Sequence, residues 1–303
     1  MKHLLSIESL SAEEIHQILD LTTKLKSERG HHDFQPLRGQ CWAMIFSKSS
    51  TRTRVSFEVG IRELGGDVMF LSSSDIQLGR GEPIKDTARV MGRMLQGVVI
   101  RTFAQSDVEE FAQYSGIPTI NALTDEEHPC QILADLFTIK EQLGSFEGKT
   151  ICFTGDGACN VPRSWMWAAA KLNFNLVIAA PSGYQPPSDF LKKINCDKIR
   201  VTEDLPAAAS GADVIYTDVW VSMGKESEAA MRLTDLAGYQ LNDAIVKLAA
   251  PGALVMHCLP AYRDKEISES IFEAHAQTIF NQAENRLHVQ KAVLSLLVQE
   301  PLI

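Results

Sequence analysis

The sequence lacks any long hydrophobic run. No stretch of the 303 residues reaches the roughly 18 uninterrupted apolar residues of a membrane span. Near the N-terminus, Glu8, Glu13 and Glu14 interrupt the apolar residues, which is untypical of a secretory signal or an Arg-rich transit peptide. We therefore expect a cytoplasmic protein without a membrane partner.

An excess of positive charge is also missing. The formal net charge is −9, and nucleic acids and membrane surfaces are themselves anionic. The charge therefore argues against general binding to either partner, although a local basic cluster could still bind a small anion. The hydrophobic share of 45% is ordinary for a globular protein, and the length allows two domains with substantial cores.

Two common cofactor patterns are absent. The six cysteines form no CxxC pair and no zinc-ligand spacing, which is typical of reduced cytosolic thiols. The segment GDGACN (155–160) resembles a dinucleotide-binding turn, but Asn160 stands where GxGxxG requires its third glycine. An NAD-dependent Rossmann enzyme is therefore disfavoured.

Strand-like runs alternate with helical patterns along the chain. A helix is predicted over residues 11–27 and a last helix over 287–298. The predicted strands are 41–46, 67–72, 97–102, 119–123, 149–155, 175–181, 199–203, 212–220 and 253–260. This alternation predicts an α/β fold with two doubly wound domains, each a parallel sheet flanked by helices. The polar break SFEGKT sets the domain bounds at 1–144 and 145–286, followed by a C-terminal helix in 287–303.

Hydroxyls and cations gather in FSKSSTRTRVSFE (46–58), directly after the first predicted strand. Helical periodicity begins near Thr51, so Ser50–Thr53 lie in a first helical turn, where free N–H groups and the helix dipole favour an anion. Arg52 adds a planar fork that matches phosphate. A helix cap needs only one hydroxyl, so we prefer a phosphate site. Arg54 is two residues further on and is expected to be structural.

Polar residues follow two other strands of the first half. Arg101 closes an apolar strand, where it is either a ligand group or an exposed cation; both interpretations stay open. His128 and Gln131 are three residues apart at a helix entry and can face one ligand. An imidazole can polarise a carbonyl group, and a glutamine amide can recognise an NH2 group.

In the second half, Asp218 and Cys258 each follow a predicted strand of one sheet. Such an acid and thiol can lie in one crevice, hold an amine and take up its charge. A lone cysteine is nevertheless more often a small buried apolar residue. Asn160 is equally compatible with a polar ligand contact and with a helix cap.

Five motifs together carry a resemblance to a known family. They are SSTRTR (49–54), HPCQ (128–131), DVWVSMG (218–224), HCLPA (257–261) and AENR (283–286). Over essentially its whole length the chain resembles the carbamoyltransferases, and the SMG and HCLP motifs mark the ornithine branch. The resemblance implies carbamoyl transfer from carbamoyl phosphate to the δ-amine of L-ornithine, giving L-citrulline and phosphate in arginine biosynthesis. It also implies no metal or cofactor, homotrimers or multiples of trimers, and a C-terminal helix packing back on the first domain.

The resemblance assigns roles to individual residues. Carbamoyl phosphate would be bound by Ser50, Thr51, Arg52, Thr53, Gln77, Arg101, His128, Gln131, Cys258, Leu259 and Arg286. Ornithine would be bound by Asn160, Asp218, Ser222 and Met223. The catalytic residues would be Arg101, His128, Asp218, Cys258 and Arg286. Gln77 would reach the phosphate of a neighbouring subunit.

Two departures and two alternatives accompany this interpretation. Ser47 stands where the branch commonly has Glu, and Cys159 replaces the first residue of an Asn pair. Thr51 argues for unmodified ornithine, since relatives that act on acylated ornithine have a bulky apolar residue there. One alternative is a carbamoyltransferase for putrescine, for which an SMG loop would have less to bind. The other is a non-catalytic paralogue, disfavoured because Arg52, His128 and Cys258 are present.

Overall fold

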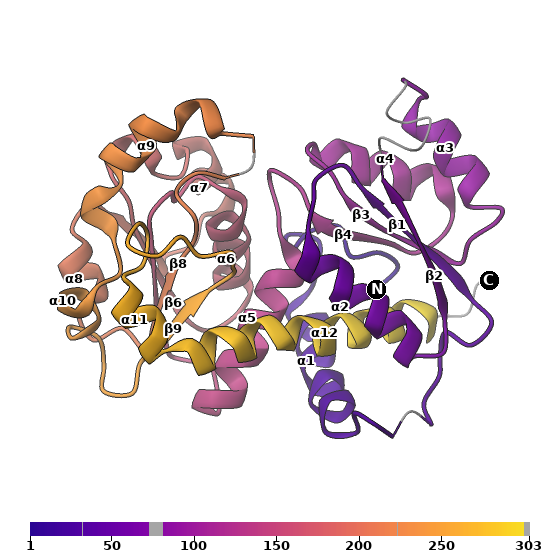
Figure 1. The fold of residues 1–303 in the computed structure, drawn as a ribbon, viewed down its shortest axis with the longest axis horizontal. Helices are drawn as coiled ribbons and strands as arrows, with labels where there is room; N and C mark the ends of the chain where they lie inside the picture. The colour runs from indigo at the N-terminus through magenta and orange to yellow at the C-terminus, as the bar shows by residue number, and fades with distance from the viewer. Residues whose placement is uncertain (32, 73–80, 223, 300–303) are drawn as a thin grey trace. The chain divides into compact units, whose positions relative to one another are not determined.

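The chain forms two compact α/β units. The computed structural model describes residues 1–31, 33–72, 81–222 and 224–299. One unit is Met1–Phe137 with the chain from Glu284 onward, and the other is Thr138–Ala283. Each has one parallel sheet flanked by helices, which confirms the predicted fold class (Figure 1). Among the described residues, no helix combines the length and apolar character needed to cross a membrane.

The first sheet has four parallel strands in the order β2-β1-β3-β4. The strands are β1 (Cys41–Phe46), β2 (Asp67–Ser72), β3 (Gly97–Arg101) and β4 (Thr119–Leu123), close to the predicted ranges. β3 is buried along its length, as expected for a parallel strand covered on both faces. The strand order reverses between β1 and β3. Open parallel sheets bind ligands at the carboxyl ends of the strands beside such a reversal.

Helices cover this sheet. They are α1 (Ala12–Ser27), α2 (Thr51–Glu63), α3 (Ile84–Met91), α4 (Gln105–Ser115) and the beginning of α5 (Pro129–Leu143). Figure 1 shows α3 and α4 beside each other on one side of the sheet. There Val108 and Phe111 of α4 join Ile45 and Val98 of the strands in one buried cluster. The apolar residues that predicted α2, such as Phe57, are likewise buried.

The second sheet has five parallel strands in the order β7-β6-β5-β8-β9. The strands are β5 (Thr150–Thr154), β6 (Asn175–Ala179), β7 (Ile199–Thr202), β8 (Val214–Thr217) and β9 (Leu254–His257). Its order reverses between β5 and β8. The helices are α6 (Asn160–Lys171), α7 (Ser188–Ile194), α8 (Leu205–Ala209), α9 (Ala229–Asp235), α10 (Asp243–Val246) and α11 (Glu269–Ala274).

All five strands of this sheet are shorter than predicted, and β8 and β9 each end three residues early. β8 ends at Thr217 because the carboxylate of Asp218 accepts the Val219 N–H at 2.7 Å, a local bond that replaces a ladder bond. β9 ends at His257 because Leu259 has a φ of 58°, in the left-handed region that a strand cannot use. As a result, Asp218 and Cys258 lie just beyond the carboxyl ends of β8 and β9.

The last helix is longer than predicted. α12 spans Ala276–Gln299, so it begins well before the expected start, and no glycine or proline interrupts the added turns. Its later part returns to the first unit, as the resemblance implies. Lys291 Nζ lies 2.7 Å from Glu63 Oε2, and a Cβ added to Gly60 would lie 3.4 Å from the Leu287 side chain. Gly60 therefore allows α2 and α12 to approach closely.

Candidate active site

The predicted anion site lies at the N-terminus of α2. Ser50 is the N-cap, and its hydroxyl accepts the Thr53 N–H at 3.3 Å. No acidic side chain occupies the first turn, so the positive end of the helix is not neutralised from within it. Thr51 is exposed and Arg52 is half-buried. One hydroxyl thus caps the helix, and the other groups are available for an anion.

A side chain from the far end of the sequence completes this turn. Arg286 of α12 is buried, and its Nη2 donates to Thr53 Oγ1 at 2.8 Å. Thr53 has no exposed surface. The hydrogen bond joins the AENR motif to the STRTR motif and fixes the guanidinium of Arg286 beside the helix end.

Arg101 and His128 lie near Arg286. Arg101 is the last residue of β3, and its carbonyl accepts the Ser47 N–H at 2.8 Å, which ties the ends of β1 and β3 together. Both side chains are buried. Burial and the charges of Arg286 and Arg101 hold the pKa of His128 well below its usual 6.5. The imidazole is therefore neutral at pH 7 and can donate one N–H without carrying charge.

Gln131 is oriented by a neighbour on its own helix. Its Nε2 donates to Asp135 Oδ1 at 2.8 Å, and the side chain is almost fully buried. Its Oε1 has no hydrogen-bond partner among the residues that the structure describes. A buried acceptor in this state suits an NH2 group, which donates hydrogen bonds.

Two cations beside the site have structural contacts. The guanidinium of Arg54 lies 3.9 Å from the Phe70 ring centroid, in agreement with the scaffold role predicted for it. Lys48 received no role from the sequence, yet it is buried, bonded to Asp125 and 4.2 Å from the Phe103 ring centroid. No local pattern could have identified these partners, because they lie in or after other strands.

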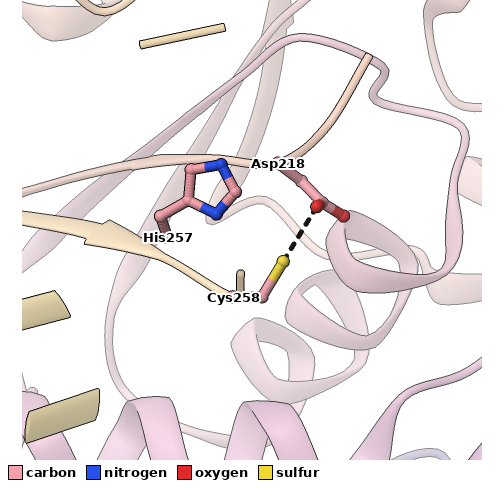
Figure 2. A group of neighbouring side chains, drawn as sticks. All are labelled: Asp218, His257 and Cys258. Carbon is pink, nitrogen blue, oxygen red and sulfur yellow. Dashed lines mark hydrogen bonds between the residues drawn. The ribbon is translucent and has the colours of Figure 1, made fainter. Parts of the chain in front are cut away.

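In the second unit, the structure brings Asp218 and Cys258 together. The Cys258 thiol donates to Asp218 Oδ1 at 2.8 Å, and both groups lie at strand ends (Figure 2). Burial raises the pKa of Asp218, opposed by the nearby His257 and by hydrogen bonds from Cys258 and Val219. The pair offers a carboxylate and a soft polar group at one point, the combination expected for holding an amine.

His257 stands beside this pair but is occupied elsewhere. Its Nδ1 accepts the Leu259 N–H at 2.9 Å, and its Nε2 lies 3.1 Å from Glu266 Oε1. The ring is therefore the tautomer that carries its proton on Nε2. Ligand atoms of Asp218, His257 and Cys258 lie within 4.8 Å of one another, a spacing that could admit a metal ion. Binding one would require the ring to give up a buried hydrogen bond, so we explain the cluster by its hydrogen bonds.

The remaining predicted ornithine residues lie in two segments. Asn160 is the first residue of α6, and the N-cap is Cys159, so the capping alternative for Asn160 is wrong. Burial, together with Asp156 and Asp218, raises the pKa of Cys159 well above its usual value, which keeps it a thiol. Ser222 is half-buried in the segment after β8. Gln77 and Met223 lie outside the described residues.

The comparison with protein families covers both units. The family description "Aspartate/ornithine carbamoyltransferase, carbamoyl-P binding domain" matches residues 2–141, and "Asp/Orn binding domain" of the same name matches residues 147–297. The chain belongs to the aspartate/ornithine carbamoyltransferase family. Most of the basic site thus falls in the carbamoyl-P binding domain, whereas Arg286 and the Asp218–Cys258 pair fall in the Asp/Orn binding domain.

Individual carbamoyltransferases resemble the chain over nearly its full length. An ornithine carbamoyltransferase of Akkermansia muciniphila is 60% identical over 98% of this chain and 98% of its own. One of Campylobacter fetus is 51% identical over 97% of each. The solved ornithine carbamoyltransferase of Pyrococcus furiosus superimposes with a TM-score of 0.92 at 41% identity, covering 99% of this chain and 98% of that one. The anabolic ornithine carbamoyltransferase of Campylobacter jejuni gives the same score and identity, covering 99% and 100%.

Proposed function

We propose that this carbamoyltransferase moves the carbamoyl group of carbamoyl phosphate to the δ-amine of L-ornithine, giving L-citrulline and phosphate. The observation that carries the choice of ornithine is the buried Asp218–Cys258 pair in the half that matches the Asp/Orn binding domain. A carboxylate attracts the amine-bearing side chain of ornithine and repels the acidic side chain of aspartate. The names of the relatives support the same choice.

Carbamoyl phosphate is assigned to the first unit. Ser50–Thr53 and Arg101 bind its phosphate through the α2 N-terminus and their side chains, while Thr53, Arg101, His128 and Arg286 polarise the carbamoyl oxygen. The Arg286–Thr53 hydrogen bond and the neutral state of His128 support this assignment. The acceptor Oε1 of Gln131 binds the NH2 group, together with the backbone carbonyls of Cys258 and Leu259.

Ornithine is assigned to the second unit. Asn160, Asp218, Ser222 and Met223 bind its α-amino and α-carboxylate groups. Asp218 and Cys258 also position the δ-amine, and their hydrogen bond supports this role.

The reaction follows from charge accounting. The neutral δ-amine attacks the carbamoyl carbon and forms a new N–C bond, which drives the carbonyl electron pair onto oxygen. Arg101, His128 and Arg286 stabilise that oxyanion. The electron pair on oxygen then re-forms the C=O bond, the C–O bond to phosphate breaks with its electron pair leaving on the phosphate, and the departing phosphate takes the extra proton of the attacking nitrogen. Arg52 and the α2 N-terminus stabilise the departing anion. Much of the rate acceleration comes from orientation of the two substrates.

A parallel citrulline assay tests the substrate. Purified protein with carbamoyl phosphate is given ornithine, putrescine, acetylornithine or aspartate, with and without a chelator. We expect turnover of ornithine alone, unchanged by the chelator. Equal or better turnover of putrescine would contradict the proposed substrate, and no turnover of any amine would favour a non-catalytic paralogue.

The assembly and location are proposed with the function. We expect a homotrimer or a multiple of trimers in which Gln77 reaches the phosphate of a neighbouring subunit, and a cytoplasmic enzyme. Light scattering after gel filtration measures the mass. A monomer of 33.5 kDa that retains full activity would contradict the assembly.

A further inference from the structure

A buried arginine lies at the strand-order reversal of the second sheet. Arg232 belongs to α9, which directly follows the segment that carries Asp218 and Ser222. Only 8% of its surface is exposed. Burying a guanidinium is costly unless it is paired and hydrogen-bonded, so its partners indicate what the residue holds in place.

The partners of Arg232 come from both sides of the reversal. Its Nη1 lies 2.7 Å from Asp156 Oδ2 and also donates to the Trp220 carbonyl at 3.2 Å. Asp156 follows β5 and Trp220 follows β8, the two neighbouring strands between which the order reverses. Its Nε donates to Glu228 Oε2 at 2.8 Å, which is a third contact of the guanidinium. We call Arg232, Asp156 and Trp220 the strand-end brace.

The brace extends into the turn that precedes Asn160. The second oxygen of Asp156, Oδ1, accepts the Ala158 N–H at 3.0 Å, a local bond that shapes this turn. Gly155 has a φ of 122°, and a Cβ placed on it would lie 3.5 Å from the Trp220 indole. The turn after β5 therefore packs directly against the segment after β8.

A tyrosine ring also lies near the guanidinium. The ring centroid of Tyr184 lies 5.2 Å from the guanidinium carbon of Arg232. The Tyr184 hydroxyl donates to Asp235 Oδ2 at 3.0 Å, at the end of α9. Arg232 is thus held by groups from several segments, and the brace is preorganised.

We propose that Arg232 is a positioning residue for the amino-acid substrate. Through Asp156 and the Trp220 carbonyl it holds two segments at a fixed spacing, the one leading to Asn160 and the one carrying Asp218 and Ser222. That spacing sets where the α-amino and α-carboxylate groups of ornithine are bound, so this inference rests on the proposed function. The planar fork reaches the three acceptors from two separate nitrogens, an arrangement that the single nitrogen of a lysine cannot reproduce.

Steady-state kinetics of Arg232→Lys and Asp156→Asn test the proposal. In both variants we expect the KM for ornithine to rise about tenfold or more, because small misplacements of binding groups are costly. The KM for carbamoyl phosphate should stay within about twofold, since the brace joins the two segments that carry groups assigned to ornithine. A purely structural role would instead reduce active protein and leave both KM values unchanged.

Asp213→Asn is the matched control. Asp213 also pairs with a cation, Lys149 at 3.1 Å, and accepts a backbone N–H, from Thr150 at 2.9 Å, but at the opposite ends of β5 and β8. It should leave both KM values unchanged. If Arg232→Lys does not fold, the double variant Asp156→Asn/Arg232→Gln carries the same test, since it leaves no unpaired buried charge.

The outcomes separate the two proposals. If the wild-type protein does not carbamoylate ornithine, the proposed function fails. If it does, and the brace variants fold with an unchanged KM for ornithine, the role of Arg232 fails. Equal rises in both KM values, or the same rise in Asp213→Asn, would also overturn it, because either would indicate a general disturbance.

Discussion

The two sheets share one plan but present opposite chemistry at their carboxyl edges. Beside the reversal between β1 and β3, the chain places Arg52 and Arg101, joined by Arg286 from α12. The segments after β5, β8 and β9 instead carry Asn160, Asp218 and Cys258. The shared topology decides where a ligand binds, and the side chains decide its charge. One edge suits a phosphate and the other suits an amine.

The two sites are also completed in different ways. The basic site depends on a hydrogen bond between Thr53 and Arg286, 233 residues apart in sequence, and so on the return of α12. The Asp218–Cys258 pair is 40 residues apart and lies wholly at the ends of β8 and β9. The first site should therefore respond to the docking of the last helix, whereas the second depends on its own sheet.

The largest expected effect separates the amine site from the phosphate site. Asp218→Asn removes the buried carboxylate while keeping its shape, and we expect kcat/KM for ornithine to fall about 1000-fold. The affinity for carbamoyl phosphate, measured by calorimetry, should not change. A comparable loss of that affinity would contradict the assignment of the two substrates to different units.

The reciprocal change affects the basic site. Arg52→Ala removes a charged fork from the α2 N-terminus, and we expect the Kd for carbamoyl phosphate to rise about 100-fold while the fold persists. Arg54→Ala is the control, two residues further along the same helix, with its guanidinium on the Phe70 ring. Calorimetry measures both variants. Equal effects would show that helix charge matters rather than a specific contact.

An effect of intermediate size is expected for His257, whose ring lies beside the Asp218–Cys258 pair. His257→Asn keeps an acceptor for the Leu259 N–H, whereas His257→Gln keeps a donor for Glu266. If the ring positions the backbone at Leu259, His257→Gln should lower kcat about tenfold and His257→Asn should lower it less. The pH profile of kcat should keep its shape in both. A lost pH-dependent limb would instead identify His257 as a proton carrier.

The smallest expected effect concerns the docking of α12. Despite burial, which raises it, the pKa of Glu63 is lowered overall by the Lys291 ammonium and by Arg29. A lowered folded-state pKa adds stability above the unfolded value, about 4.3, and that stability is lost as the pH falls through the folded value. Glu63→Gln should cost about 1 kcal/mol at pH 7, because glutamine still offers Lys291 an acceptor. Calorimetric unfolding should show the difference from wild type shrinking as the pH falls below about 4.3, and a constant difference would contradict it.

The fold was largely predictable, because hydrophobic periodicity is a local signal. The ranges of β1, β2 and β4 and the start of α2 near Thr51 follow from adjacent residues, and the structure agrees with them. Element ends were less accurate. β8 stops early at the Asp218–Val219 hydrogen bond, and β9 stops early before the left-handed Leu259. The predicted start of α12 was too late, because the apolar stripe used for the prediction covers only the later part of the helix.

The sequence predicted which residues of the site meet at the ends of neighbouring strands. It did not predict which individual charged side chains form pairs. Asp218 and Cys258 were expected together because parallel strands of one sheet share a carboxyl edge. The pairs Lys48–Asp125 and Arg232–Asp156 could not be anticipated, since charged residues are common and no pattern specifies their partners. The joining of Arg286 to Thr53 depended on the resemblance, not on spacing.

The sequence by itself determined the two α/β units, the residue types at the strand ends and the motifs that mark the family. These are local properties, written in periodicity and in contiguous residues. Only the tertiary structure decided which strands lie beside each reversal, that burial and two nearby arginines lower the pKa of His128, and that Arg232 ties two strand ends together. Sheet order, burial and pairing arise from contacts between distant residues, and those contacts exist only after the chain has folded.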